Sequence, residues 1–148
     1  MRFWDSSAIV PLAVEEAASA LLSNLYRLDS TVLVWALTST EVTSALCRRH
    51  REGALDRAQL QASEERLRRL REDWTEVQDL DPVRLRAERL LHVHSLTAAD
   101  GLQLAAALIA TEERPQGFSF VTLDDRLGEA AAREGFLIQG IPGSIPRP

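Results

Sequence analysis

The sequence has no lysine, a single cysteine and few aromatic residues. All 17 basic residues are arginines, and 22 acidic residues give a formal net charge of -5. Cys47 cannot form a disulfide within the chain, so a disulfide framework is excluded and a reducing cytoplasm is the expected location. Long apolar runs are also absent, since none approaches the ~18 residues that a membrane span needs. We therefore expect no membrane span and, because Asp5 interrupts the first apolar residues, no signal peptide.

The charge balance bears on the partners that the protein can have. A net charge of -5 is unfavourable for binding nucleic acid, because phosphate groups attract positive charge. Arginine, however, forms bidentate contacts with phosphate and carboxylate groups alike. A local basic surface is therefore possible on this acidic protein.

Length and composition indicate one globular domain over residues 1–148. The fractions of apolar residues (45%) and charged residues (26%) are ordinary for such a domain. A chain of this size can bury a core without disulfides or a structural metal. No repeat or linker divides the chain, and residues 139–148, which contain prolines and glycines, are expected to form an irregular C-terminal tail.

Apolar spacing and turn residues predict alternating strands and helices. Strands are expected at residues 2–4, 31–35, 74–77, 118–122 and 136–139. Helices are expected after Ser6 and Ser7, which can cap a short helix near Pro11, and then at residues 15–28, 38–51, 56–73, 81–94, 98–111 and 124–134. Strands separated by helices favour an α/β sandwich with a mainly parallel sheet of four to five strands.

Four acidic residues fall where strands are expected to end or helices to begin. Asp5 follows the first strand, and Glu41 lies in the first turn of the helix that follows the second strand. Asp124, with Asp125 beside it, follows the strand at 118–122. Asp100 lies early in the apolar helix at 98–111. In parallel sheets, ligand sites gather outside the carboxyl ends of the strands. We therefore expect these acids to converge.

The surroundings of Asp100 suggest a reason for such a cluster. Its helix is apolar on most faces, which predicts a buried helix. An unpaired carboxylate buried there would cost several kcal/mol. A divalent cation among acids would compensate this cost, and sites rich in oxygen ligands suit Mg²⁺ or Mn²⁺.

A purely structural interpretation of the acids stays open. Thr38 and Glu41 have the spacing of a capping box, and Thr97 with Asp100 and Thr122 with Asp125 imitate it. Carboxylates near a helix N-terminus also favour the helix dipole. Because the order of the strands is not visible in the sequence, spacing alone leaves convergence a hypothesis.

The chain resembles the PIN-domain family, and within it the VapC-like toxins, over nearly its full length. Four segments carry the resemblance: FWDSSAIVPL at 3–12, TSTEVTSAL at 38–46, LTAADGLQLAAAL at 96–108 and FVTLDDRL at 120–127. Each segment is weakly specific by itself, whereas all four in this order and at these intervals are strongly specific. The resemblance implies a three-layer α/β/α PIN-like sandwich.

The acids of the family carry over to this sequence one at a time. The resemblance implies that Asp5, Glu41, Asp100 and Asp124 are catalytic residues and metal ligands, with Asp125 as the second choice for the fourth position. Gly101 and Gln103 replace the usual alanine and the frequent histidine of the family's motif without touching the acids. Ser7 or Ser6, and Thr122, match hydroxyl positions that shape the site.

The function implied by the resemblance is that of a toxin ribonuclease. It would hydrolyse RNA with Mg²⁺ or Mn²⁺ as cofactor, form a homodimer and be inhibited by a cognate VapB-like antitoxin. A PIN-like nuclease of RNA processing without an antitoxin and a non-catalytic PIN-like binding protein remain as alternatives. Receiver domains and phosphoaspartyl enzymes are disfavoured, because those families need a lysine, and the Asp-x-Asp pattern of haloacid-type phosphatases is broken by Ser7.

Two segments of the chain are rich in arginine. Residues 48–51, Arg-Arg-His-Arg, form a candidate patch that could bind phosphate or a partner protein. Cations at a helix C-terminus also complement the helix dipole, and this second role is the interpretation that we favour. The second segment holds Arg66, Arg68, Arg69 and Arg71 beside Glu64, Glu65 and Glu72, and these residues are expected on a solvated, ion-paired face.

Overall fold

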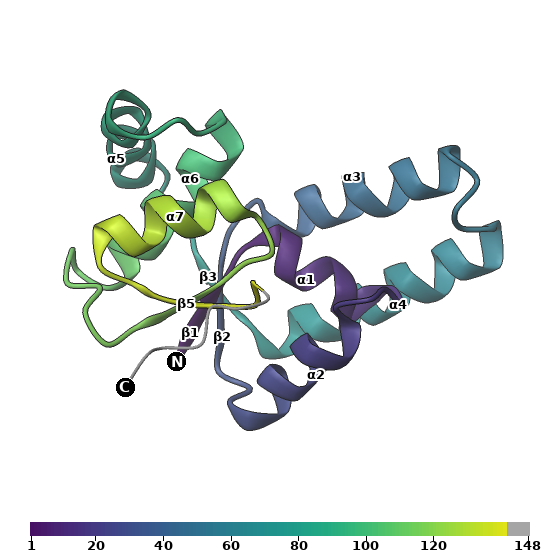
Figure 1. The fold of residues 1–148 in the computed structure, drawn as a ribbon. Coiled ribbons are helices and arrows are strands. Elements are labelled where there is room, and N and C mark those ends of the chain that lie inside the picture. The colour runs from purple at the N-terminus through teal and green to yellow at the C-terminus, as the bar shows by residue number, and fades with distance from the viewer. Residues whose placement is uncertain (142–148) are drawn as a thin grey trace.

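The computed structural model describes residues 1–141, which form a five-stranded parallel sheet flanked by helices (Figure 1). The strands lie in the order β3-β2-β1-β4-β5, and every neighbouring pair is parallel. Their bounds are β1 Arg2–Trp4, β2 Val32–Trp35, β3 Thr75–Val77, β4 Ser119–Val121 and β5 Leu137–Gln139. The predicted α/β class with a parallel sheet is confirmed.

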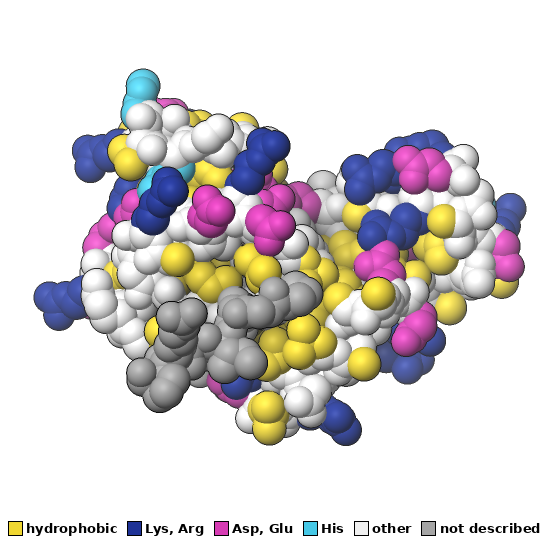
Figure 2. All heavy atoms as spheres, viewed as in Figure 1, with side chains coloured by type: hydrophobic (Ala, Val, Ile, Leu, Met, Phe, Trp, Pro, Cys, Tyr) yellow, Lys and Arg dark blue, Asp and Glu magenta, His cyan; other side chains and the backbone are white. Residues whose placement is uncertain are grey.

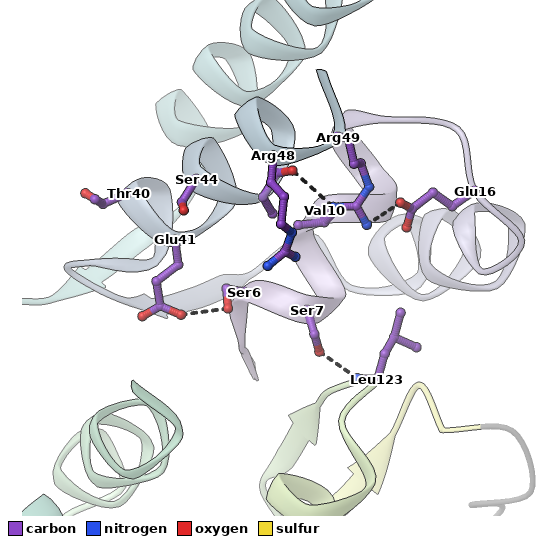
Figure 3. Close-up of a pocket in the computed structure, with 11 residues that line it drawn as sticks. Ser6, Ser7, Val10, Glu16, Thr40, Glu41, Ser44, Arg48, Arg49 and Leu123 are labelled. Atoms are coloured by element: carbon purple, nitrogen blue, oxygen red, sulfur yellow. Dashed lines mark hydrogen bonds and ion pairs between the residues drawn. The ribbon is translucent and has the colours of Figure 1, made fainter. Parts of the chain in front are cut away.

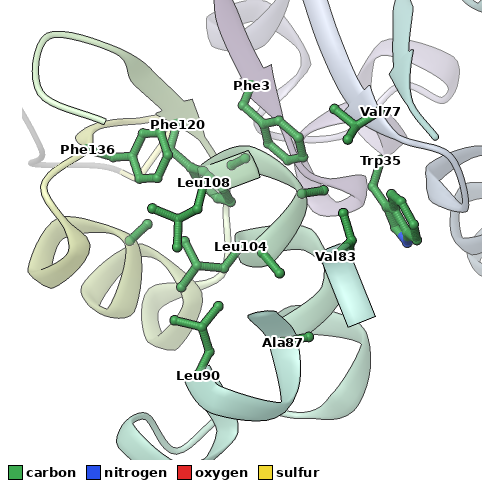
Figure 4. Close-up of a cluster of buried hydrophobic side chains, with 14 of the residues drawn as sticks. Phe3, Trp35, Val77, Val83, Ala87, Leu90, Leu104, Leu108, Phe120 and Phe136 are labelled. Atoms are coloured by element: carbon green, nitrogen blue, oxygen red, sulfur yellow. The ribbon is translucent and has the colours of Figure 1, made fainter. Parts of the chain in front are cut away.

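Alternating side chains on the short strands build a core on each face of the sheet. In β1, Phe3 points to one face and Trp4 to the other. The ring of Phe3 stacks on that of Phe120 in β4, with centroids 5.3 Å apart. Figure 4 shows this core, where both rings pack near Leu104 and Leu108 of a buried helix.

Helices cover both faces and complete the three layers. The face of Trp4 is covered by α1 Ser6–Ala13, α2 Ser19–Leu28, α3 Thr38–Arg51 and α4 Arg57–Asp73. The face of Phe3 is covered by α5 Leu80–Val93, α6 Ala98–Ala110 and α7 Asp125–Glu134. The expected three-layer α/β/α sandwich is therefore confirmed.

Helices α3 and α4 form a hairpin that extends away from the sheet (Figure 1). Gly53, with φ +81°, begins the turn between them, and glycine adopts this left-handed backbone without a steric penalty. Asp56 then caps α4 in a capping box with Gln59. The buried side chain of Leu46 packs in the same cluster as that of Leu67, which keeps the hairpin closed.

Several predicted helix starts are wrong by a few residues. The first helix is capped by Asp5 and not by Ser6 or Ser7, since the Asp5 carboxylate accepts from the backbone N–H groups of Ser7 and Ala8. Helix α2 begins at Ser19 instead of residue 15, because the Ser19 hydroxyl accepts from the Glu16 N–H and stabilises a turn there. Helix α5 has Asp79 as its N-cap, two residues before Asp81, which with Pro82 was the predicted start.

The remaining expectations concern the tail and the membrane. Of the tail expected at 139–148, residue 139 ends β5, and residues 142–148 lie outside the described part of the chain. Over residues 1–141, no single helix is long and apolar enough to cross a membrane; α5 and α6 satisfy the length and composition only as a pair, and they are bent by 118°.

Candidate active site

The acids singled out in the sequence stand at one edge of the sheet or at helix starts near it. Asp5 directly follows β1, and Glu41 lies in the first turn of α3, which follows β2. Asp124 is the N-cap of α7, which follows β4. Because β1, β2 and β4 are parallel neighbours, their carboxyl ends share one edge of the sheet, where ligand sites of such folds form.

Asp5 is the buried acid of this edge. Only 3% of its surface is exposed. Burial raises the pKa of its carboxyl from 3.8 to about 7, although hydrogen bonds from Ser7, Thr122 and Ala8 oppose the shift. The strongest of these comes from the Ser7 hydroxyl, which donates to Oδ1 over 2.8 Å. The chain thus keeps a carboxylate where its negative charge is unfavourable in the absence of a cation.

Glu41 is held by side chains from two other helices. Ser6 of α1 donates its hydroxyl hydrogen to Glu41 Oε2 over 2.7 Å, and Gln103 of α6 donates from Nε2 to the same oxygen over 3.2 Å. Burial raises the pKa of the Glu41 carboxyl, the bonds from Ser6 and Gln103 lower it, and the charge of Asp100 raises it further. Glu41 and Asp100 are therefore close enough to repel each other.

The expected burial of Asp100 is wrong. Asp100 is only partly buried, because it lies in the first turn of α6, before the fully covered stretch that includes Leu104 and Leu108. Thr97 caps the helix, and its hydroxyl donates to Asp100 Oδ2 over 2.7 Å. The argument that a buried carboxylate needs a compensating charge therefore applies to Asp5 instead of Asp100.

The fourth acid has two candidates with different surroundings. Asp124 is partly buried, and its Oδ1 accepts from the Leu127 N–H over 2.9 Å as the cap of α7. Asp125, the first residue of the helix, is exposed. Both remain predicted ligands.

Two of the suggested capping boxes are absent. Thr38 does not cap α3, whose N-cap is Leu37; its buried hydroxyl instead accepts from Gln103 Nε2 over 3.1 Å. Thr122 does not cap α7 and accepts from the Asp124 N–H over 3.0 Å. These hydroxyls support the site where the sequence suggested helix caps.

A hydroxyl network joins the strand ends that carry Asp5 and Asp124. The Ser7 hydroxyl accepts from the Leu123 N–H over 2.8 Å and lies 3.3 Å from the Thr122 hydroxyl. Ser7 and Thr122, the two predicted supporting residues, therefore lie beside Asp5.

Gln103 and Ser6 contact Glu41 directly, which the sequence did not predict for Gln103. Gln103 lies three residues after Asp100, hence on the same side of α6, which was the available signal.

The carboxylate and hydroxyl oxygens at this edge suit a divalent cation, but the acids do not by themselves form a complete set of metal ligands. Within residues 1–141, no three or more acidic, histidine or cysteine side chains are grouped closely enough to hold a metal ion by themselves. Mg²⁺ usually keeps several waters and is bound through one or two carboxylates together with substrate phosphates. The buried Asp5 and the mutually repelling pair Glu41 and Asp100 fit such an open site.

A surface cavity of about 550 Å³ is lined by one of the four acids, Glu41. Its lining also includes Ser6 and Ser7 of α1 and Arg48 of α3 (Figure 3). Figure 2 shows acidic side chains beside an apolar hollow between α7 and the α3–α4 hairpin, with arginines on the hairpin. The cavity therefore presents hydroxyl, carboxylate and guanidinium groups together with apolar side chains to a ligand.

Comparison with known proteins supports the fold. No protein-family model matches the chain, and no curated protein matches it significantly in sequence. Among solved structures, PAE2754 from Pyrobaculum aerophilum matches with a TM-score of 0.65 and 21% identity, over 93% of this chain and 87% of that chain. FitAcB from Neisseria gonorrhoeae matches with a TM-score of 0.66 and 18% identity, over 95% and 98%. The chain thus has a PIN-like fold, and at these identities the likeness is one of fold alone.

Proposed function

We propose that this protein is a metal-dependent endoribonuclease that hydrolyses RNA phosphodiester bonds. The observation that carries the proposal is the buried Asp5 carboxylate at the carboxyl edge, with its pKa raised to about 7 by burial. Acids with strongly perturbed pKa values beside a cavity are candidates for a functional site. The partly buried Glu41 lines a cavity, and burial raises the pKa of its carboxyl as well.

In this proposal, Asp5, Glu41 and Asp100 hold Mg²⁺ or Mn²⁺, and Asp124 or Asp125 completes the acidic surroundings. When bound, the cation supplies charge stabilisation at the phosphate and acidifies water. The binding of a cation would also offset the desolvation that raises the pKa of Asp5 and the repulsion between Glu41 and Asp100.

The side chains of the protein then orient the reacting groups. Glu41 has a defined position, because Ser6 and Gln103 both donate to its Oε2. A carboxylate fixed in this way can accept a proton from the attacking water at its other oxygen. The Ser7 hydroxyl fixes Asp5 by donating to Oδ1, so that neither acid needs to reorganise during the reaction.

Cleavage of a single-stranded RNA, with Mn²⁺ or Mg²⁺ and with EDTA, tests the proposal. Wild-type protein should cleave only with the metal, and both Asp5→Asn and Asp100→Asn should lose at least about 100-fold in rate, as expected for removal of a group that stabilises the transition state. Glu129→Gln, on the exposed side of α7, is the matched control. Cleavage that persists in EDTA, or in Asp5→Asn, would refute the proposal.

We further propose that the enzyme is a homodimeric toxin of a type II toxin–antitoxin module with a VapB-like antitoxin. The support is the four-segment resemblance to VapC-like toxins together with the PIN-like fold. An arginine of the antitoxin inserted among Glu41, Asp100 and Asp124 would compete with the metal. Co-purification with the product of an adjacent small gene, loss of cleavage in that complex, and a dimer mass by light scattering are the tests. A nuclease without such a partner would instead belong to RNA processing, and a protein that binds RNA without cleaving it would be the non-catalytic alternative.

A further inference from the structure

The basic run at the end of α3 is divided by its contacts. Arg49 forms an ion pair with Glu16 and donates to the Ala45 carbonyl. His50 Nδ1 lies 2.8 Å from the Leu55 carbonyl oxygen and thereby helps to close the turn of the hairpin. These two residues have structural partners. Arg48 is exposed and lines the cavity beside Glu41 (Figure 3).

The position of Arg48 follows from helix geometry. Thr40, Ser44 and Arg48 are spaced by four residues and form one stripe on α3, and all three line the cavity. Arg48 lies seven residues after Glu41, about 10 Å along the helix axis. Because helical side chains lean towards the N-terminus, the guanidinium reaches back towards the acids. Figure 3 shows it pointing towards Ser6 and Ser7.

This arrangement answers the problem that the net charge of -5 poses for binding RNA. A cluster of acids repels a polyanion, so a fixed cation at the rim is needed to hold the strand next to them. A planar guanidinium binds a phosphate through two parallel hydrogen bonds, and hydroxyls are common further donors to phosphate oxygens. Arg48 and Ser44, one helical turn apart on α3, offer this combination in the lining of the cavity.

We propose that Arg48, assisted by the hydroxyl of Ser44, binds a backbone phosphate of the RNA strand beside the bond to be cleaved. The proposal rests on the proposed ribonuclease function and names a residue that binds the substrate. It gives Arg48 a role beyond that of a cation complementing the helix dipole. Arg51, at the end of the same helix, carries the same charge but is absent from the cavity lining. It therefore serves as the matched control.

The test is the binding of a fluorescently labelled single-stranded RNA in EDTA, measured by anisotropy at salt concentrations from about 50 to about 200 mM. Arg48→Ala should weaken binding about 5- to 10-fold, in line with the loss of one exposed charge-assisted contact. The slope of log K against log salt should fall by about 0.7, the value for one phosphate contact on a single strand. Arg48→Lys should be intermediate, because it keeps the charge and loses the bidentate geometry.

The control variant separates a phosphate site from general charge. Arg51→Ala should bind within about twofold of the wild type and keep its salt slope. Equal losses in the two alanine variants, no loss in Arg48→Ala, or no RNA binding by the wild type would each overturn the proposal. Melting temperatures of both variants within about two degrees of the wild type would exclude misfolding as the cause of a loss.

Cleavage with Mn²⁺ on the same samples distinguishes the two proposals. Arg48-dependent binding without any cleavage by the wild type would refute the ribonuclease function and leave the phosphate site standing. Normal cleavage and binding by Arg48→Ala would refute the phosphate site and leave the ribonuclease function standing.

Discussion

Gln103 donates a hydrogen bond to Glu41 over 3.2 Å and so joins α6 to the first turn of α3. Its amide also donates to the Thr38 hydroxyl over 3.1 Å, which fixes its orientation. The Gln103 side chain is buried, with 1% of its surface exposed. It contacts Glu41 and not the space for a substrate, so it is a positioning residue.

Replacement of Gln103 should therefore reduce activity through Glu41. In Gln103→Ala we expect cleavage to fall about 10- to 100-fold, with weaker Mn²⁺ binding, as is usual when a partner of a metal-holding carboxylate is removed. Gln103→His, which keeps a ring N–H donor, should recover part of both. Leu104→Ala removes a buried neighbour without that donor, and its cleavage rate well below the melting temperature should stay near that of the wild type. Equal rates in Gln103→Ala and Leu104→Ala would refute the positioning role.

Asp5 should make metal-free stability depend on pH. Its folded pKa, about 7, lies above the unfolded value of 3.8, so the folded state binds the proton more tightly. Its contribution to stability is fully present below the unfolded value and is lost as the pH rises through 7. Asp5→Asn cannot titrate and still offers a capping oxygen. The difference in unfolding free energy between Asp5→Asn and the wild type should therefore grow in favour of the variant by about 2 to 3 kcal/mol from about pH 5 to about pH 8. This size follows from the shift of the Asp5 pKa.

Urea unfolding in EDTA at several pH values measures this difference. Added Mn²⁺ should reduce it, because a ligand that binds only the folded wild type stabilises it. A difference that stays constant with pH would mean that the pKa of Asp5 is near its ordinary value.

Gly140 should be far less tolerant of substitution than Gly117. Both have positive φ, +99° and +84°, so alanine is strained at either position. A Cβ at Gly140 would lie 2.5 Å from the Thr122 carbonyl oxygen, whereas a Cβ at Gly117 has no heavy atom within 4 Å. We expect Gly117→Ala to cost about 1 kcal/mol and Gly140→Ala about 2 to 4 kcal/mol.

The same comparison also tests the hydroxyl network. Because the displaced backbone carries Thr122, whose hydroxyl lies 3.3 Å from that of Ser7, Gly140→Ala should also slow cleavage, while Gly117→Ala should not. Thermal melts and cleavage rates at one temperature below both transitions measure the two effects. Equal melting temperatures for the two variants would contradict the close approach at Gly140.

Glu134 should stabilise the fold without affecting the site. It accepts from Arg86 over 3.0 Å and lies 2.7 Å from His94 Nε2, and so it links the end of α7 to α5. Glu134→Gln should cost about 1 to 3 kcal/mol, because Arg86 and the buried His94 lose a charged partner. The exposed Glu129→Gln should cost less than about 0.5 kcal/mol. Cleavage below the melting temperature should be unchanged, since α7 separates Glu134 from Asp124 by about 15 Å. A slower rate would mean that the two ends of α7 are coupled.

The order of elements and the layers of the fold could be predicted from the sequence, because each segment has apolar residues at the spacing typical of a strand or a helix. Residues 38–51 form a helix as predicted, with Gly53 beyond its end, and all five strands lie where β-branched and aromatic residues gather. The alternation of Phe3 and Trp4 between two cores is likewise the two-residue period of a strand. Helix starts were less predictable, since Asp5, Ser6 and Ser7 can all serve as caps.

The partners of the acids could not be predicted, because they lie far apart in the sequence. The bond from Gln103 to Glu41 spans 62 residues, and that from Ser6 to Glu41 spans 35. The burial of Asp100 was overestimated for a related reason: an apolar helix indicates burial of its length, while the extent to which its first turn projects beyond the sheet depends on tertiary packing. The sequence predicted acids at strand ends and helix starts, and packing decided which of them is buried.

The central place of β1 has a consequence for the synthesis of the protein. This strand leaves the ribosome before one of its two neighbours, β4, which lies more than a hundred residues later in the chain. Until β4 is made, the Asp5 N–H lacks the Val121 carbonyl that accepts from it, and the Ser7 hydroxyl lacks the Leu123 N–H. A chain translated as far as α6 therefore contains Asp5, Glu41 and Asp100, but it lacks the backbone of residues 121–123 that supports Asp5 and Ser7. Under the proposed function, a chain that ends before β4 should therefore lack nuclease activity.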